Sequence, residues 1–232
     1  MANGQAAARR IVIAIDGPAG SGKSTLAARL ARRYGYTNIE TGAMYRALAL
    51  KAIERNLPFT DPAAMADLAR SSTITLQATS EGNRVLLDGK DVTDRVRRQD
   101  VTEAASQVSI HPAVRQWMVE RQREMGAGGG IVMEGRDIGT KVFPHAEVKI
   151  FLDAAPEVRG NRRFLQNPGA PAPEAAVLAE LRARDQRDRT RANSPLVAAP
   201  DAVTIDSTHL TLEQVVEKAV AIVERKLSQA GS

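Results

Sequence analysis

Short apolar runs alternate with longer stretches of helical period along this chain. Residues 11–15 read Ile-Val-Ile-Ala-Ile, a run rich in β-branched side chains that is typical of a strand buried on both faces of a parallel sheet. Similar short runs are found at residues 131–133, 148–152 and 202–205, with a shorter one at 38–40. We predict these five segments to be strands.

The stretches between these runs have helical period. They cover residues 23–33, 43–55, 112–125, 173–191 and 211–227. Strands that alternate with helices indicate a doubly wound α/β fold, and right-handed crossovers would place helices on both faces of the sheet.

Two segments interrupt this alternation. Residues 72–96 contain a run of period two and the triplets Glu81-Gly82-Asn83 and Asp88-Gly89-Lys90, which are typical of hairpin turns, so we predict a small antiparallel insertion. Residues 167–173 form a loop rich in proline and glycine, expected between two arginine-rich helices. Residues 1–9 are expected to be a disordered tail.

Composition excludes several classes of protein. The chain has 232 residues, of which 43% are hydrophobic and 25% charged, values that exclude a disordered or a collagen-like chain. No run approaches eighteen apolar residues and the N-terminus lacks the apolar core of a secretory signal, so we expect no membrane span. The chain has no cysteine, which excludes disulfides, thiolate zinc sites and a cysteine nucleophile. We therefore expect a cytoplasmic protein.

The net charge of +5 is concentrated in arginines at residues 159–163 and 182–191. Such clusters favour nucleic acid, an acidic membrane face or an anionic small substrate as the partner. Binding of single-stranded nucleic acid uses aromatic side chains for stacking, and the only aromatic residue next to these runs is Phe164. We expect small anionic substrates, with neither nucleic acid nor membrane as a partner.

A phosphate-binding loop follows the first predicted strand and opens a helix. The segment fits the pattern G-x-x-x-x-G-K-[ST] at every fixed position. Its glycines allow close approach of the backbone to a phosphate chain, and its N–H groups and the helix N-terminus supply partial positive charge. The motif predicts ATP binding with Mg²⁺, in which Lys23 reaches the β- and γ-phosphates and Ser24 ligates the metal. We expect Lys23 to lie in a solvent-lined loop. The candidate ATP-binding residues are Gly17, Pro18, Ala19, Gly20, Ser21, Gly22, Lys23, Ser24 and Thr25.

The other motifs narrow the class of P-loop protein. The chain has no Asn-Lys-x-Asp string for guanine recognition and is too short for a large ATPase, which leaves kinases that phosphorylate an anionic acceptor. Such an acceptor requires arginines, whose guanidinium groups bind phosphate oxygens in bidentate fashion. Residues 40–46 and 134–140 each place an arginine after a predicted strand, at the edge of the sheet where α/β proteins bind ligands.

The chain resembles the bacterial cytidylate kinases from about Ile11 to its C-terminal helix. The strings that carry this resemblance are Ile15-Asp-Gly-Pro-Ala-Gly-Ser-Gly-Lys-Ser24, Thr41-Gly-Ala-Met-Tyr-Arg46, Ala104-Ala-Ser-Gln-Val108, Glu134-Gly-Arg-Asp-Ile-Gly-Thr140 and Asp188-Arg-Thr-Arg191. The chain departs from the family at Thr41, where serine is common, and at Glu40 and Glu134, where aspartate is common. Threonine keeps the hydroxyl group of serine, and glutamate keeps the negative charge of aspartate.

The resemblance implies a P-loop kinase with a five-stranded parallel sheet flanked by helices, a small antiparallel β insertion in the monophosphate-binding region and a mobile lid. Residues 10–230 would form one domain. Its core would comprise residues 10–40, 101–156 and 192–230, its monophosphate-binding region residues 41–100 and its lid about 157–191. The implied activity is transfer of the γ-phosphoryl of ATP to CMP or dCMP, by a monomer.

The resemblance also implies roles for individual residues. Thr41 would hydrogen-bond near the cytosine, and Arg46 and Arg136 would clamp the acceptor phosphate. Further roles fall to three sets: Ser106, Arg115 and Asp137 would read the cytosine edge, Arg184, Asp188 and Arg191 would contact the sugar and phosphate, and Arg159, Arg162 and Arg163 would belong to the lid. The expected catalytic residues are Lys23, Arg136, Arg184 and Arg163.

Alternatives to this interpretation remain open. A different acceptor on the same scaffold, such as AMP, UMP or shikimate, would alter the positions that read the base. A P-loop binding or regulatory protein with a basic surface for nucleic acid is the other alternative. For Arg159 a solvated helix face competes with a role in the lid. His111 is expected to cap a helix, and Trp117 to lie in the core.

Overall fold

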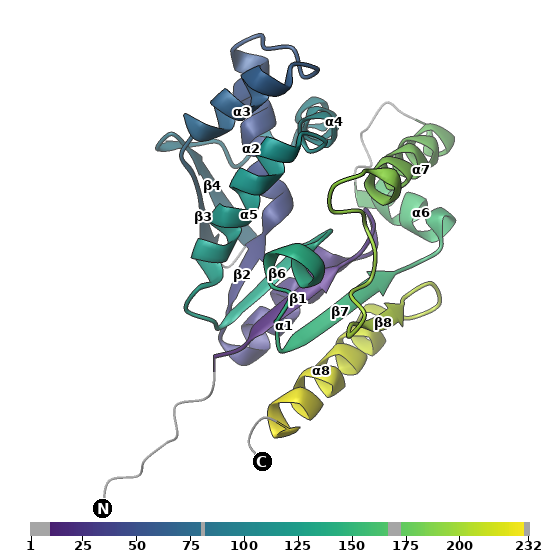
Figure 1. Cartoon of the computed structure of the whole chain (residues 1–232). Helices are drawn as coiled ribbons and strands as arrows, with labels where there is room; N and C mark the ends of the chain where they lie inside the picture. Colours follow the sequence, from purple (N-terminus) through teal and green to yellow (C-terminus); the bar gives the residue numbers. More distant parts are fainter. Residues whose placement is uncertain (1–9, 80–81, 167–172, 230–232) are drawn as a thin grey trace, which may run out of the picture.

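The computed structural model describes residues 10–79, 82–166 and 173–229 (Figure 1). The disordered tail expected at residues 1–9 and nearly all of the loop expected at 167–173 lie outside the described residues. Within the described part of the chain, no helix combines the length and the apolar character that crossing a bilayer requires.

A five-stranded parallel sheet forms the centre of the molecule, as the resemblance implied. The strand order is β2-β6-β1-β7-β8, with each neighbouring pair parallel. The strands are β1 (Val12–Asp16), β2 (Thr37–Glu40), β6 (Ile131–Gly135), β7 (Val148–Asp153) and β8 (Val203–Asp206). All five predicted strands are present, with ends that differ from the prediction by at most two residues.

Both faces of this sheet are buried, as the continuous apolar runs predicted. Ile13 and Ile15 of β1 pack with α1 (Lys23–Tyr34) and α8 (Leu212–Gln229) on one face. Ala14, which points to the opposite face, belongs to a cluster that also contacts α5 (Pro112–Gly126).

Helices α2 (Thr41–Glu54) and α7 (Glu174–Thr190) complete the five predicted helices, and α6 (Pro156–Gln166) is the arginine-rich helix expected before the loop. Four elements were not predicted: helices α3 (Pro62–Arg70) and α4 (Gln99–Val108), the 3₁₀ turn η1 (Arg95–Arg97) and the single π-helical turn η2 (Ile138–Val142). Figure 1 shows α2 to α5 gathered on one side of the molecule and the packed pair α6 and α7 on the other.

The antiparallel insertion is also confirmed. It consists of β3 (Ile74–Thr79), β4 (Gly82–Leu87) and β5 (Lys90–Asp91) in that order. Asp88 and Gly89 form the second turn with φ values of 50° and 81°, which favour glycine at one of the two positions. Gly82 and Asn83, expected in the first turn, instead belong to β4.

Asn83 joins the insertion to the edge of the main sheet. Its Nδ2 donates to the carbonyl of Asn38 at 2.8 Å, and its Oδ1 accepts from the backbone N–H of Glu40 at 2.7 Å. One buried side chain therefore fixes the insertion against β2.

Candidate active site

Two adjoining cavities lie at the carboxyl ends of the central strands. One has a volume of about 450 Å³ and reaches α2, α4 and α7; the other, of about 490 Å³, lies between the phosphate-binding loop, α6 and the start of α8. We call them the acceptor cavity and the donor cavity, after the roles that the sequence predicts for their residues. Lys23, Ser24 and Arg163 line both.

The backbone of the phosphate-binding loop requires its glycines. Gly17, Gly20 and Gly22 have φ values of 152°, 75° and 96°. A Cβ on Gly17 would lie 2.0 Å from the carbonyl oxygen of Leu152, so no larger residue fits there. Gly22 is also the N-cap of α1 and has no side chain that could compete with a phosphate for the first N–H groups of the helix.

Lys23 is buried, contrary to the expectation of a solvent-lined position. Its side chain folds back onto the loop, where Nζ donates to the carbonyl of Pro18 at 2.6 Å. Burial, and then the positive charge of Arg136, lower the pKa of Lys23 to about 7. A polyanionic ligand would reverse these effects, which suits this site to a phosphate chain.

Ser24 and Glu134 form an oxygen-rich corner between the cavities. The Ser24 hydroxyl donates to Glu134 Oε1 at 2.7 Å. Burial raises the pKa of Glu134, opposed by the charge of Lys23. The described residues contain no group of three or more histidine or acidic side chains placed to hold a metal. Mg²⁺ typically takes only one or two protein oxygens, with water and substrate phosphates completing its shell, so this hydroxyl and carboxylate fit it.

Asp16 was not predicted as a site residue. It is buried at the end of β1 and accepts from the N–H groups of Ile138 and Gly139 at 2.8 and 2.7 Å. Burial raises its pKa to about 6 despite these bonds. The carboxylate thereby holds η2 against the end of β1.

The two arginines expected to clamp the acceptor phosphate both line the acceptor cavity, and each contacts a carboxylate. Arg46 donates to Glu40 at 2.6 Å, and Arg136 donates to Asp188 at 2.9 Å. Half-buried Arg184 lines the same cavity, and its pKa is lowered to about 10 by burial and by the charge of Arg136. Among the described residues, no carboxylate forms an ion pair with Arg184.

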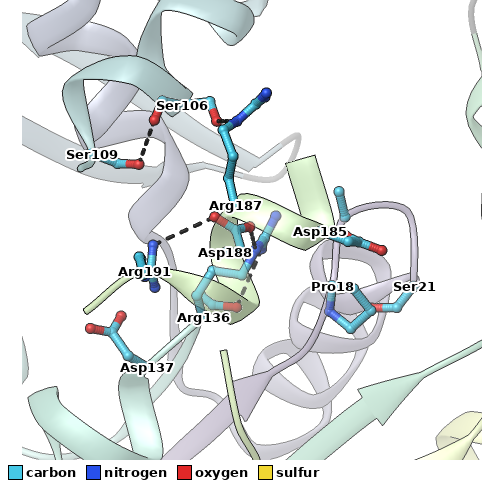
Figure 2. A network of polar contacts seen from close by, with 12 residues as sticks. Pro18, Ser21, Ser106, Ser109, Arg136, Asp137, Asp185, Arg187, Asp188 and Arg191 are labelled. Atoms are coloured by element: carbon cyan, nitrogen blue, oxygen red, sulfur yellow. Dashed lines mark hydrogen bonds and ion pairs between the residues drawn. The ribbon is translucent and has the colours of Figure 1, made fainter. Parts of the chain in front are cut away.

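Asp188 is the centre of a charged network (Figure 2). It pairs with Arg136 and, at 3.5 Å, with Arg191, whose Nε also donates to the carbonyl of Ser194. Burial alone would raise the pKa of Asp188, but the charges of Arg136, Arg184 and Arg191 hold it below its ordinary value. The carboxylate is therefore ionised and fixes two cations at the cavity wall.

The residues expected to read the base lie together. Arg115 Nη2 donates to Asp137 Oδ2 at 2.5 Å, and both side chains are less than a tenth exposed. The guanidinium also lies 5.7 Å from the centre of the Tyr45 ring. Ser106, on α4, accepts from Arg187 of α7 at 3.3 Å. Tyr45 and Arg187 were not predicted as site residues, although Tyr45 lies within a string that carried the resemblance.

Thr41 is placed at the same wall. Its hydroxyl donates to the carbonyl of Glu134 at 2.8 Å. This bond ties the start of α2 to the end of β6, so in this structure the hydroxyl is engaged with the backbone.

The three arginines expected in a lid occupy different environments. Arg163 lines both cavities. Arg162 lines the donor cavity and donates to the carbonyl of Ser207 at 2.8 Å. Arg159, expected either on a solvated helix face or near the transferring phosphoryl, is 2% exposed. The solvated interpretation is therefore wrong.

Arg159 is an anchor for the phosphate-binding loop. Its guanidinium donates to the carbonyls of Ala154 and Ala19 at 2.8 and 3.0 Å and pairs with Asp185 of α7 at 2.6 Å. Figure 2 shows Asp185 beside the loop residues Pro18 and Ser21. The contacts of Arg159 therefore join the loop to α7.

Two other residues weighed from the sequence lie outside the cavities. His111 is the N-cap residue of α5, but its Nε2 lies 2.6 Å from the carbonyl oxygen of Phe59. Contrary to the expectation, its side chain makes no capping hydrogen bond to the helix. Trp117 packs, half-buried, against the cluster formed by α2 to α5, as predicted.

The acceptor cavity is strongly cationic. Among the described residues that line it, eight lysines and arginines face four carboxylates. An excess of this size suits ligands that carry several negative charges, because each phosphate oxygen can accept from a fixed cationic donor.

Comparison with known proteins agrees with this site. The sequence profile of the family described as cytidylate kinase matches residues 13–225. A cytidylate kinase of Geobacillus kaustophilus (strain HTA426) is 49% identical over 94% of this chain and 99% of the relative. One from Pelotomaculum thermopropionicum is 50% identical over 90% of this chain and 94% of the relative. A solved gluconokinase of Sinorhizobium meliloti is a remote match, with 17% identity and a TM-score of 0.49 over 96% of this chain and 97% of that one. On the strength of the profile and the two relatives, this chain belongs to the cytidylate kinase family.

Proposed function

We propose that the protein transfers the γ-phosphoryl of ATP to CMP or dCMP, giving ADP and CDP or dCDP. The observation that carries this proposal is the meeting of two cavities at Lys23 and Arg163. One cavity contains the phosphate-binding loop and the other has the buried ion pair of Arg115 and Asp137, so donor and acceptor phosphates would meet where these two cations lie.

The donor triphosphate would bind along the N–H groups of residues 17–25. The corner formed by Ser24 and Glu134 would hold Mg²⁺, which when bound neutralises charge on the β- and γ-phosphates. Lys23 would exchange its bond to Pro18 for phosphate oxygens and thereby regain its full positive charge.

In the transfer step, an oxygen of the acceptor phosphate attacks the γ-phosphorus while the bond from this phosphorus to the β–γ bridging oxygen breaks. The transition state is loose, so positioning and charge neutralisation do most of the work. Four cations that line the acceptor cavity would surround this point: Lys23, Arg136, Arg184 and Arg163. Because Arg184 and Arg163 have no carboxylate partner among the described residues, their charge is available to the phosphoryl group.

The acceptor nucleotide would be bound through its phosphate, its sugar and its base. Arg46 and Arg136 would bind the phosphate, and Asp188 with Arg184 and Arg191 the sugar and phosphate. Arg115 and Asp137, with Ser106, would read the cytosine, since a buried pair offers both a donor and an acceptor to the polar edge of a base.

An assay of ADP release against a panel of acceptors tests this proposal. With ATP and Mg²⁺ in excess, we expect CMP and dCMP to give the highest kcat/KM among CMP, dCMP, UMP, AMP and shikimate. Lys23→Ala, which lacks the amine at the meeting point, should bring turnover close to background. A higher kcat/KM with AMP or shikimate would contradict the proposal. Retention of a random DNA duplex at low salt, with a steep salt dependence, would favour the nucleic-acid alternative.

We further propose that the protein acts as a monomer in the cytoplasm. The absence of cysteine fits a reducing compartment, and the resemblance to the monomeric bacterial cytidylate kinases supports a monomer.

A further inference from the structure

Asp16 is a buried carboxylate that takes no part in the proposed transfer step. It is 4% exposed and lines neither cavity, although Gly17 of the phosphate-binding loop follows it directly. Its charge is therefore not offered to a substrate. A buried carboxylate costs free energy unless its oxygens accept hydrogen bonds, so the bonds of Asp16 indicate what it does.

Both carboxylate oxygens accept hydrogen bonds from the start of η2. Oδ1 accepts from the N–H of Ile138 at 2.8 Å, and Oδ2 accepts from the N–H of Gly139 at 2.7 Å. The first N–H groups of a helical turn have no acceptor within the turn, and the side chain of Asp137, in the N-cap position, does not cap it. Although burial raises its pKa to about 6, Asp16 is largely ionised at neutral pH and can accept both bonds. It therefore caps η2 from a distant segment of the chain.

The same residue also fixes the segment before η2. In the parallel ladder of β1 and β6, Asp16 is the register partner of Gly135, the last residue of β6. Only Arg136 and Asp137 lie between this strand and Ile138, the first residue of η2. The chain is therefore held by Asp16 on both sides of these two residues, by the backbone ladder before them and by the carboxylate after them.

The two residues held in this way both line the acceptor cavity and contact different helices. Arg136 donates to Asp188 of α7, and Asp137 accepts from Arg115 of α5. A shift of the backbone between β6 and η2 would move both side chains together. Misplacement of a positioned group by about 1 Å can cost about 10²-fold in rate, so the acceptor site should be sensitive to this contact.

We propose that Asp16 is a positioning residue for the acceptor site, which its carboxylate serves by fixing the backbone of Arg136 and Asp137. It touches no substrate itself. The inference rests on the proposed function and adds a link to it: the strand that leads into the phosphate-binding loop also sets the shape of the segment that binds the acceptor.

Two variants disturb this contact from opposite sides. Asp16→Asn keeps the shape of the side chain but turns an amide NH₂ group toward one of the two N–H donors, so one of the two bonds is lost. Gly139→Ala leaves β1 and the phosphate-binding loop unchanged, but its Cβ would lie 3.3 Å from Oδ2 of Asp16, a close contact that pushes η2 away from the carboxylate. Asp61→Asn is the matched control, because Asp61 accepts from the N–H groups of Ala63 and Ala64 at the start of α3 and lines neither cavity.

Kinetics with ATP, CMP and UMP would be measured for each variant, together with melting temperatures. We expect both variants to lower kcat/KM for CMP by about tenfold to a hundredfold, the range expected for misplacement by up to about 1 Å. The preference for CMP over UMP should fall as well, because the displaced Asp137 reads the base. The KM for ATP should stay within about threefold in Gly139→Ala, since the phosphate-binding loop is unchanged, and Asp61→Asn should match the wild type in all kinetic constants.

Amide hydrogen exchange gives a readout that needs no substrate: the N–H groups of Ile138 and Gly139 should exchange faster in Asp16→Asn than in the wild type. If Asp16→Asn does not fold, Gly139→Ala carries the kinetic test alone. A lower melting temperature with unchanged kcat/KM and an unchanged preference for CMP would assign Asp16 to the stability of the fold and overturn the inference. Equal effects of Gly139→Ala on ATP and CMP would overturn it too. If the wild type preferred another acceptor, the proposed function would fail instead, and the same comparison would be made with that acceptor.

Discussion

Burial gives Lys23 an acid–base behaviour that an exposed lysine does not have. In the nucleotide-free protein its pKa is about 7, against 10.5 for an ordinary lysine. Between these two values the unfolded chain binds more protons at this site than the folded one, so the contribution of Lys23 to stability improves as the pH rises through this window. A bound triphosphate should restore the ordinary pKa.

Nucleotide binding should therefore take up a proton at Lys23. We expect uptake of about half a proton per site at pH 7, approaching one near pH 8.5, because the free protein loses this proton over that range. Calorimetry of ATP binding in buffers of different ionisation enthalpy measures it. Lys23→Arg keeps the charge without titrating, so it should show no such uptake; equal uptake in this variant would assign the proton to another group.

The pairing of Arg115 with Asp137 makes selectivity and stability inseparable at this site. Asp137→Asn leaves a buried guanidinium without its counter-charge, which costs about 3 kcal/mol in comparable cases. We expect a lower melting temperature together with a higher KM for CMP and weaker discrimination against UMP. Glu157→Gln, which breaks the exposed pair with Arg182, is the control and should change none of these. If Asp137→Asn weakens CMP and UMP equally, the pair supports the fold and not the base.

Single residues were predictable where a short motif fixes the backbone. The spacing of Gly17, Gly22 and Lys23 predicts a phosphate-binding loop, and in the structure both glycines have the positive φ angles that favour glycine. The partners of those residues were not predictable, because Arg159 and Asp185, or Ser24 and Glu134, meet only after distant segments have packed.

At the level of elements, the contacts of Arg159 link α6, α7 and the phosphate-binding loop. Arg159→Ala removes the donor to the Ala19 carbonyl and leaves the Asp185 carboxylate buried without its cation. We expect a loss of about 3 kcal/mol in unfolding free energy and a higher KM for ATP, since the loop is no longer held in shape. Denaturant unfolding and steady-state kinetics measure these effects.

Arg182→Gln is the matched control for this variant, because it breaks an exposed ion pair between the same two helices. It should leave both quantities nearly unchanged. If Arg159→Ala unfolds at the same denaturant concentration as Arg182→Gln, the buried contacts do not hold the loop.

The elements that escaped prediction did so for different reasons. Helix α4 buries Val101, Ala104, Ala105 and Val108, a helical spacing that is present in the sequence but short and set among polar residues. The turn η2 could not be predicted from its own residues, because its N–H groups donate to the carboxylate of Asp16, more than a hundred residues away.

At the scale of the whole molecule, Arg163 lies where the two cavities meet, so the proposed transfer step should depend on it. We expect Arg163→Ala to lower kcat by about 10³–10⁵, the effect of an arginine that reaches the transferring phosphoryl, with little change in the KM for ATP. Arg162→Ala, which removes a guanidinium engaged with Ser207, should lower kcat much less. Single-turnover measurements separate the chemical step from product release. A loss below tenfold for Arg163→Ala would show that this arginine makes no contact with the phosphoryl group.

The overall architecture followed from the alternation of strands and helices, and the location of the site from the rule that ligands bind at the carboxyl ends of parallel strands. The way in which the two cavities join could not be predicted in this way, because it depends on how α6 and α7 pack against each other. The arginines of these helices could be recognised as a cluster, but the sequence does not show that Arg163 faces both cavities while Arg159 faces the interior.

The contact between Asn83 and β2 has a consequence for how the protein behaves in concentrated solution. β2 is an edge strand of the main sheet, and an open edge exposes backbone groups that can recruit a strand of another molecule. The side-chain amide of Asn83 occupies a donor and an acceptor of this edge, in the way that a neighbouring strand would. The backbone groups of Asn38 and Glu40 that Asn83 occupies are not open to a strand of another molecule, so we expect the insertion to lower the tendency of this edge to pair with another sheet.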